Sequence, residues 1–208
     1  MLVAATIRAR ARSLLNEIVE GFYLDEEFNN WISDAAIDIS GKTYCYMTNE
    51  YIDLVTMTEL YDLPLNSLKI ISVSYDGVGL ERMSVTMKGK QTAVITGKPK
   101  YYYEINSMLG VAPLPTAAEL ETTPQLETYV SMVTNNITNI PDKFQLAAVL
   151  FTTSMGLIKI KQYDKAVQLY NMYMASLGFD RQDVFTPQVE QPPPQNQYVL
   201  KVALQPPQ

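Results

Sequence analysis

Apolar residues recur at helical spacing in four stretches of the chain, two near its start and two near its end. The first two stretches cover residues 3–22 and 25–39, and the last two cover residues 142–161 and 163–178. In each stretch the apolar positions follow the i, i+3, i+4, i+7 rule of a helix with one buried face. The pattern therefore predicts four amphipathic helices that pack against one another.

The last two stretches predict a helical hairpin against which the other helices pack. Pro141 precedes the first of them, where the missing backbone N–H of proline costs nothing. Gly178 follows the second, at a position where a helix commonly ends in the left-handed conformation. The apolar face expected for the last helix consists of Tyr163, Ala166, Val167, Tyr170, Met174 and Leu177.

Between the two helical pairs the apolar pattern changes to a period of two, with many β-branched and aromatic residues. The expected strands are residues 51–57, 68–75, 80–87, 91–96 and 126–133. Asp76-Gly77 is a strong hairpin signal because both central positions of such a turn favour positive φ, and Lys88-Gly89-Lys90 indicates a second turn. Residues 98–115 are expected to be extended, with Pro113 and Pro115 favouring an edge or a connector.

Together these patterns predict an α+β fold, in which an antiparallel helical bundle of two N-terminal and two C-terminal helices carries an inserted β-hairpin and strand region. We expect residues 1–47 and 135–178 to form the bundle and residues 48–134 to form the β region. Residues 179–208 are expected to form an extended C-terminal tail, because half of the chain's 12 prolines lie there.

The tail nevertheless contains a strand pattern at residues 198–204. Its alternating apolar residues are Tyr198, Leu200, Val202 and Leu204. A strand that follows a proline-rich spacer predicts pairing with the open edge of a sheet elsewhere. A tail that stays disordered is the alternative.

Composition narrows the possible function classes. The chain has 208 residues and a net charge of −6, which disfavours a nucleic-acid binder held by phosphate contacts. It has no histidine, and its single cysteine, Cys45, allows neither an internal disulfide nor a thiolate metal cluster. Phosphate-loop, nucleophile-elbow and metal-ligand motifs are absent, so we expect no enzyme activity and no cofactor. Without a membrane-length apolar run or a signal-peptide pattern, we expect a soluble protein made in the cytoplasm, with no membrane partner.

Charge is distributed unevenly along the chain. All charged residues of the second helix and of the segment before it are acidic, namely Glu17, Glu20, Asp25, Glu26, Glu27, Asp34 and Asp38. The strand region instead gathers Arg82, Lys88, Lys90, Lys98 and Lys100. Two patches of opposite sign suit a head-to-tail contact between copies, which makes a ring if it closes. The inter-subunit residues expected from this reasoning are Lys88, Lys90, Lys98 and Lys100 on one copy and Glu20, Glu26, Glu27 and Asp34 on the next.

The first helix carries three arginines, Arg8, Arg10 and Arg12. Their spacing spreads them around much of the helix circumference instead of lining one face. We therefore expect salt bridges to the acids of the second helix or to a partner, and not a nucleic-acid surface.

Several motifs occur in a characteristic order over about residues 3–178. The helical part begins with an arginine-bearing first helix and a second helix that has an acidic start and Trp31 near its centre. The strand region then contains Tyr61-Asp62-Leu63-Pro64, a strand and turn at 71–77, Pro99-Lys100-Tyr101, Pro113-Leu114-Pro115 and a strand with Tyr129. Ile140-Pro141-Asp142 follows, and the last motif is a final helical pair with Tyr163 and Ala166. In this order of motifs the chain resembles the bacteriophage head-to-tail adaptor proteins, also called head completion or connector proteins. It departs from their pattern at Gly41, where the family often has a longer second helix, and at residues 101–110.

The resemblance implies a virion structural protein, without enzyme activity, that forms a ring beneath the portal at the head-to-tail junction. Such a ring extends the DNA channel, does not bind the passing DNA specifically, and gives tail components a platform. The implied partners are the twelve-fold portal protein, neighbouring copies in a matching homo-oligomeric ring, and tail or neck proteins. The strand pattern of the tail would then bind the portal or a neighbouring copy.

Other function classes remain open from the sequence. The first is a tail-completion or neck protein that binds the tail and not the portal. The second is a hydrolase that uses a carboxylate pair such as Asp34 and Asp38, although these acids also fit a solvated helix face. A DNA-binding module is the third.

Overall fold

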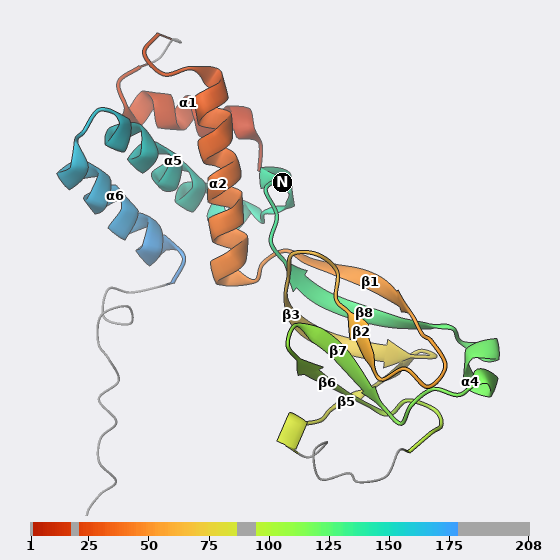
Figure 1. Ribbon diagram of the computed structural model, residues 1–208. Coiled ribbons are helices and arrows are strands. Elements are labelled where there is room, and N and C mark those ends of the chain that lie inside the picture. Colours follow the sequence, from red (N-terminus) through yellow and green to blue (C-terminus); the bar gives the residue numbers. More distant parts are fainter. Residues whose placement is uncertain (1, 18–20, 87–94, 179–208) are drawn as a thin grey trace, which may run out of the picture.

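The computed structural model describes residues 2–17, 21–86 and 95–178, and it has an α+β fold (Figure 1). Its four long helices are α1 (Ala4–Leu14), α2 (Asp25–Thr43), α5 (Gln145–Lys159) and α6 (Tyr163–Ser176). These helices lie at one end of the molecule and the strands lie at the other (Figure 1). None of the helices in the described residues has the length and apolar character needed to cross a membrane.

α5 is the central helix. It contacts α1, α2 and α6, and all of residues 147–157 except Met155 are buried. A helix that is apolar on most sides packs against several neighbours at once. The core that it shares with the other helices includes Ile7, Ile32, Ile39, Phe151 and Tyr173. Helices from the two ends of the chain therefore fold around one apolar core.

The helix ends differ from the predicted ones. α1 stops at Leu14, well before residue 22, and Asn16 follows it with a φ of 57°. α2 continues through Gly41 to Thr43 and ends at Tyr44, which has a φ of 53°. Gly178 has a φ of 89°, so the left-handed end predicted for α6 is confirmed.

The buried face of α6 agrees only in part with the predicted one. Leu169, Tyr173, Met174 and Leu177 are buried or partly buried against the helical core, and Ala166 is also buried, so Ala166, Met174 and Leu177 are as predicted. Tyr163 and Val167, which were predicted to be buried, are each 57% exposed. Because α6 carries apolar residues on two overlapping faces, its own sequence does not choose between them. Packing against α5 buries the face that contains Tyr173.

The strands form two four-stranded sheets. Sheet 1 contains, in spatial order, β1 (Met47–Asp53), β8 (Gln125–Met132), β3 (Ser67–Tyr75) and β4 (Val78–Gly79), all antiparallel. Sheet 2 contains β2 (Leu60–Asp62), β7 (Met108–Ala112), β6 (Tyr101–Ile105) and β5 (Glu81–Arg82), with β5 parallel to β6. The short helices α4 (Ala117–Thr122), η1 (Ile137–Asn139) and η2 (Asp142–Phe144) lie in connections.

The two sheets share a second apolar core. Sheet 1 contributes Ile70, Val73, Tyr75, Leu126 and Val130, and sheet 2 contributes Tyr61, Tyr102, Leu109 and Val111. Alternate residues of β8 enter this core, as the period of two predicts.

The turns test the strand predictions. Asp76 and Gly77 have φ values of 55° and 70°, which confirms the hairpin between β3 and β4. The hairpin between β6 and β7 turns at Asn106 and Ser107, with φ values of 49° and 61°, and was missed because neither residue is glycine. The strand predicted at 80–87 is wrong beyond Arg82. The turn predicted at Lys88-Gly89-Lys90 and most of the strand predicted at 91–96 lie outside the described residues.

Candidate interaction surfaces

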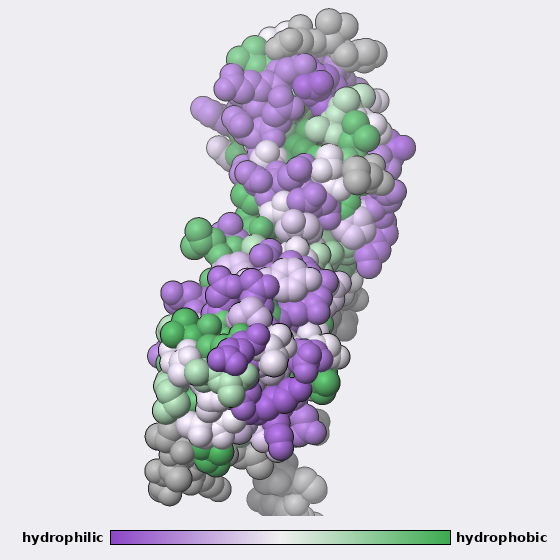
Figure 2. Space-filling view, turned by 90° about the vertical axis from the view of Figure 1, so that its right-hand side faces the viewer, coloured by the Kyte–Doolittle hydropathy of each residue, from purple (hydrophilic) through white to green (hydrophobic). Residues whose placement is uncertain are grey.

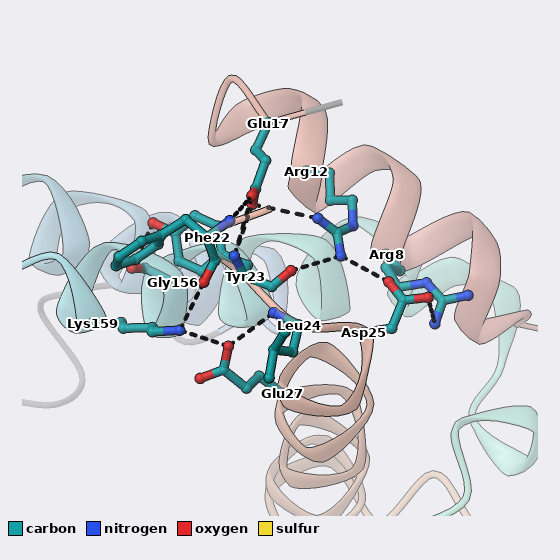
Figure 3. Close-up of polar contacts among 10 residues, drawn as sticks. All are labelled: Arg8, Arg12, Glu17, Phe22, Tyr23, Leu24, Asp25, Glu27, Gly156 and Lys159. Carbon is teal, nitrogen blue, oxygen red and sulfur yellow. Dashed lines mark hydrogen bonds and ion pairs between the residues drawn. The ribbon is translucent and has the colours of Figure 1, made fainter. Parts of the chain in front are cut away.

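Arg12 anchors the connection between α1 and α2. Its side chain is 6% exposed, and Nη2 donates to the Tyr23 carbonyl at 2.9 Å and to Oδ1 of Asp25 at 2.7 Å (Figure 3). Nη1 lies 3.4 Å from Oε2 of Glu17, and the guanidinium lies 4.7 Å from the ring centre of Phe28. A planar guanidinium suits this site because it binds several acceptors at once and stacks on an aromatic face.

Asp25 binds a second arginine of the first helix. Nη1 of Arg8 lies 3.0 Å from Oδ2 of Asp25, so one carboxylate bridges Arg8 and Arg12. The prediction that these arginines pair with acids of the second helix is confirmed for both, whereas Arg10 is exposed. At the start of α2 the Glu27 carboxylate accepts a hydrogen bond from the Leu24 N–H.

The end of α5 belongs to the same network. Nζ of Lys159 lies 2.6 Å from Oε2 of Glu27 and donates to the Phe22 carbonyl at 3.1 Å (Figure 3). The Tyr23 hydroxyl donates to the Gly156 carbonyl at 3.1 Å. The hydrogen bond from Lys159 lowers the pKa of Glu27, so this carboxylate is ionised at neutral pH. The network therefore ties α1, the start of α2 and the end of α5 together.

Most acids of the predicted acidic patch form ion pairs within the chain and are therefore not free to contact another copy. The acids paired inside the chain are Glu17, Asp25, Glu27 and Asp38. Glu26 and Asp34 are exposed, and they share the outer face of α2 with Asn30 and Ile37. Glu20 lies outside the described residues. On the side shown in Figure 2, hydrophilic residues cover most of the helical end.

The described basic residues of the strand region lie at the other end of the molecule. Nζ of Lys98 pairs with Oδ2 of Asp76 at 2.8 Å, and this hydrogen bond raises the pKa of Lys98 and lowers that of Asp76. Lys100 is exposed next to β6. Lys88 and Lys90 lie outside the described residues. Glu26 and Asp34 lie on α2, at the opposite end of the molecule (Figure 1).

Two further surfaces lack a covering partner among the described residues. β1 is an edge strand of sheet 1 along its whole length. A groove of about 360 Å³ lies where the ends of α1 and α5 meet α6. Its apolar lining consists of Leu14, Leu15, Leu157, Ile160 and Leu169. Both surfaces are suited to contact with another polypeptide.

Among the described residues no group of His, Cys, Asp and Glu side chains is arranged to hold a metal ion. The largest pKa shifts belong to Tyr103 and Tyr173, whose pKa values are raised by burial and by Glu59 and Asp38 respectively. Both hydroxyls donate to these carboxylates inside the fold, which is a structural use of the side chains. The anchors predicted in the tail, Tyr198, Leu200, Val202 and Leu204, lie outside the described residues.

Comparison with known proteins places this chain in a family. A family model described as SU10 adaptor protein matches residues 3–192. Because this match spans most of the chain, the protein belongs to the SU10 adaptor protein family, and the resemblance to bacteriophage head-to-tail adaptors is confirmed. Membership in a family of structural adaptors implies a non-enzymatic role.

One solved structure similar to this chain is described as the neck of a native GTA particle computed with C12 symmetry. The identity is 12%, the TM-score is 0.26, and the similarity covers 85% of this chain and 91% of that chain. No curated protein matches the chain.

Sequence reasoning missed Lys159 and the unpaired edge at β1. Lys159 had no signal, because it is 132 residues away from Glu27 in the chain. β1 begins four residues earlier than the predicted strand at 51–57, since Met47 and Asn49 carry little strand propensity.

Proposed function

We propose that this chain is a virion structural protein that forms a homo-oligomeric ring beneath the portal, at the head-to-tail junction of a bacteriophage. The ring extends the DNA channel and offers tail or neck proteins an attachment platform. The observation that carries the proposal is the match to an adaptor family over residues 3–192. No cofactor, metal or membrane takes part.

Two properties of the chain support this role. Its net charge of −6 suits a channel that does not retain DNA, since a basic lumen would attract the phosphates. Many large apolar side chains are exposed, among them Leu65 at 87%, Tyr51 at 63% and Phe22 at 59%. Exposed apolar side chains in this number suit a protein that is covered by partners.

The proposal includes charged contacts between neighbouring copies. Lys98 and Lys100, together with Lys88 and Lys90, would face the acidic outer surface of the next copy. On that surface Glu26 and Asp34 carry the contact, because Glu27 is already paired with Lys159. Since the two patches lie at opposite ends of the molecule, a closed ring requires each copy to lean toward its neighbour.

The proposal also assigns a different structural part to each of three regions of the chain. Residues 1–47 and 135–178 would form an antiparallel helical bundle, and residues 48–134 would carry the β region. Residues 179–208 would be a partner-binding tail whose strand pattern anchors it on the portal or on a neighbouring copy.

The mass of the purified full-length protein, alone and after mixing with its portal, tests the proposal. Native mass spectrometry should detect a complex in which a ring of adaptor copies matches the portal in number. An adaptor that remains unassembled and ignores the portal, but binds isolated tail tubes, would replace this proposal with the tail-completion alternative.

A further inference from the structure

The edges of the two sheets differ in length and protection. β4 and β5 have two residues each, and β2 has three. β3 is uncovered beyond β4, but its pairing is interrupted by two register shifts and it carries Lys69. Short strands, bulges and lysines are the devices by which proteins protect sheet edges. β1 has seven residues in regular register with β8, and it contains no proline and no lysine.

The backbone groups on the free edge of β1 follow from its register with β8. The Met132 N–H donates to the Tyr46 carbonyl at 2.9 Å, and the Leu54 N–H donates to the Pro124 carbonyl at 2.7 Å. In an antiparallel pair, residues that bond to the partner alternate with residues that point away from it. The N–H and C=O groups that point away from β8 therefore belong to Met47, Asn49, Tyr51 and Asp53.

These backbone groups make almost no hydrogen bonds in the described part of the chain. Their one hydrogen-bond partner there is Oγ1 of Thr48, 3.5 Å from the Asn49 carbonyl. An edge strand with such a row of unpaired groups is a template for an additional strand.

The side chains of β1 define what the added strand would meet. Ile52 packs against the core between the sheets, so Thr48, Glu50 and Ile52 line the inner face. Met47 and Tyr51, which are 41% and 63% exposed, lie on the outer face. A strand beside β1 therefore needs an apolar row toward the core and a solvent-compatible row outside.

We propose that residues 198–204 of a second copy add to β1 and extend sheet 1. This proposal rests on the ring put forward above. Tyr198, Leu200, Val202 and Leu204 form the row that continues the core beyond Ile52, and the segment is as long as β1. Lys201 is its only charged residue, whereas both charged residues of β1, Glu50 and Asp53, are acids. Lys201 would lie on the outer face together with Asp53.

The chain between the last described residue and this segment is long enough to reach a neighbour. Fully extended, residues 179–197 span about 60 Å. Each copy would then give one strand and receive one. Such a heterologous exchange closes when the ring closes, and backbone hydrogen bonds supply much of its affinity.

Disulfide trapping in the full-length protein, assembled with its portal, tests the exchange. In a Cys45→Ser background, Asn49→Cys is combined in turn with Val199→Cys, Lys201→Cys and Ala203→Cys, which sample the outer row of the added strand. Mild oxidation should convert at least one of these pairs into a ladder of covalently linked copies on a denaturing gel.

Ser72→Cys provides the matched control, because Ser72 is exposed on the outer face of the same sheet but lies on β3. Combined with the same tail cysteines it should give no ladder. Links within single chains would assign the edge to the chain's own tail, and links to portal cysteines would assign the tail to the portal. Either result would overturn the exchange between copies.

A proline in the segment gives a second readout. Lys201→Pro combined with Val202→Pro removes a backbone donor that faces β1 whether the added strand runs antiparallel or parallel, and it should raise hydrogen exchange of the β1 peptide about tenfold in the assembled ring, while Gln195→Pro in the spacer should not. Rings that assemble normally but show equal exchange in both variants would refute the strand exchange and leave the proposed function intact. Absence of any ring in the mass measurement would refute the proposed function itself.

Discussion

Gly110 is needed because of a close approach, not because of its backbone angles. It lies on β7 opposite Tyr103 of β6, and a Cβ at this position would be 2.2 Å from Cζ of the tyrosine ring. The ring is 3% exposed, and its hydroxyl donates to the Glu59 carboxylate. The ring is therefore held at its far end and has little freedom to move away.

Gly110→Ala should lower the free energy of unfolding by about 1–3 kcal/mol, the usual effect of inserting a methyl group into a packed site. Chemical denaturation of the full-length protein measures it. Gly79→Ala is the matched control, since a Cβ there meets nothing within 4 Å, and it should change stability by less than about 0.5 kcal/mol. Equal effects in the two variants would contradict the packing argument.

Several buried tyrosines make the fold sensitive to alkaline pH. Burial raises the pKa values of Tyr23, Tyr61, Tyr75, Tyr103 and Tyr173 above their usual range. A raised pKa means that the folded chain keeps a proton that the unfolded chain releases near pH 10. The stability linked to these groups is therefore complete below about pH 10 and decreases as the pH rises further.

Tyr173→Phe should reduce this pH dependence. The variant lacks one group that ionises only on unfolding, so the loss of stability between pH 10 and 11 should be smaller by about 1 kcal/mol. Unfolding free energies measured at pH 9, 10 and 11 give the slope. The variant should also be less stable at neutral pH by about 1.5–3 kcal/mol, because the hydrogen bond to Asp38 is lost. Tyr163→Phe, at an exposed position, should leave the stability at neutral pH unchanged.

Charged groups connect α1, α2 and α5 at their junction, next to the apolar cluster of Ala11, Tyr23 and Phe28. Arg8 and Arg12 bind Asp25 across the short connection between α1 and α2, whereas Lys159 binds Glu27 from 132 residues away in the chain. Arg12 is the buried cation of this junction, and a buried charge is strongly destabilising when its partner is lost, so position 12 tolerates little change. The arrangement also directs the outer face of α2, with Glu26 and Asp34, away from the helical core.

Arg12→Lys should destabilise the protein by about 2 kcal/mol, because an ammonium does not reproduce the fork that reaches the Tyr23 carbonyl and two carboxylates. Thermal or chemical unfolding measures the loss. Arg10→Lys changes the same residue type two positions away at an exposed site and should be neutral. A neutral Arg12→Lys would mean that water, not the guanidinium, satisfies the junction.

The separation of charge between the two ends of the molecule becomes important in assembly. Exposed acids on α2 and exposed bases near β5 and β6 are too far apart to neutralise each other within one copy (Figure 1). Contacts between copies would pair them, and such contacts between exposed charges weaken with salt.

Lys88→Glu with Lys90→Glu should block ring assembly, and added salt should loosen the wild-type ring in the same mass measurement. Reversing the charge of the acidic surface on α2 by Glu26→Lys with Asp34→Lys should also block assembly when it is made without the lysine changes. Mixing the two double variants should restore a closed ring when the number of copies is even, because alternating the variants brings opposite charges together at every interface, and combining all four changes in one chain should also restore it. Lys69→Glu with Lys143→Glu, elsewhere on the surface, should assemble normally.

Part of the proposed interaction surface was already visible in the amino-acid sequence. The excess of acids in α2 and of bases in the strand region is a property of composition, and so is the strand pattern around Leu200. Which acids are free was not visible. Glu27 pairs with Lys159 and Asp38 with Lys42, whereas Glu26 and Asp34 face outward.

Local signals established the secondary structure type and several ends. Helical periodicity, Gly178 and the Asp76-Gly77 turn each depend on neighbouring residues, so they act in the same way in any context. The buried face of α6 and the free edge of β1 depend instead on α5 and β8, which lie elsewhere in the chain. Such features are created when distant segments pack together, because only then do one face of a helix and one edge of a strand acquire a neighbour while the others stay open to a partner.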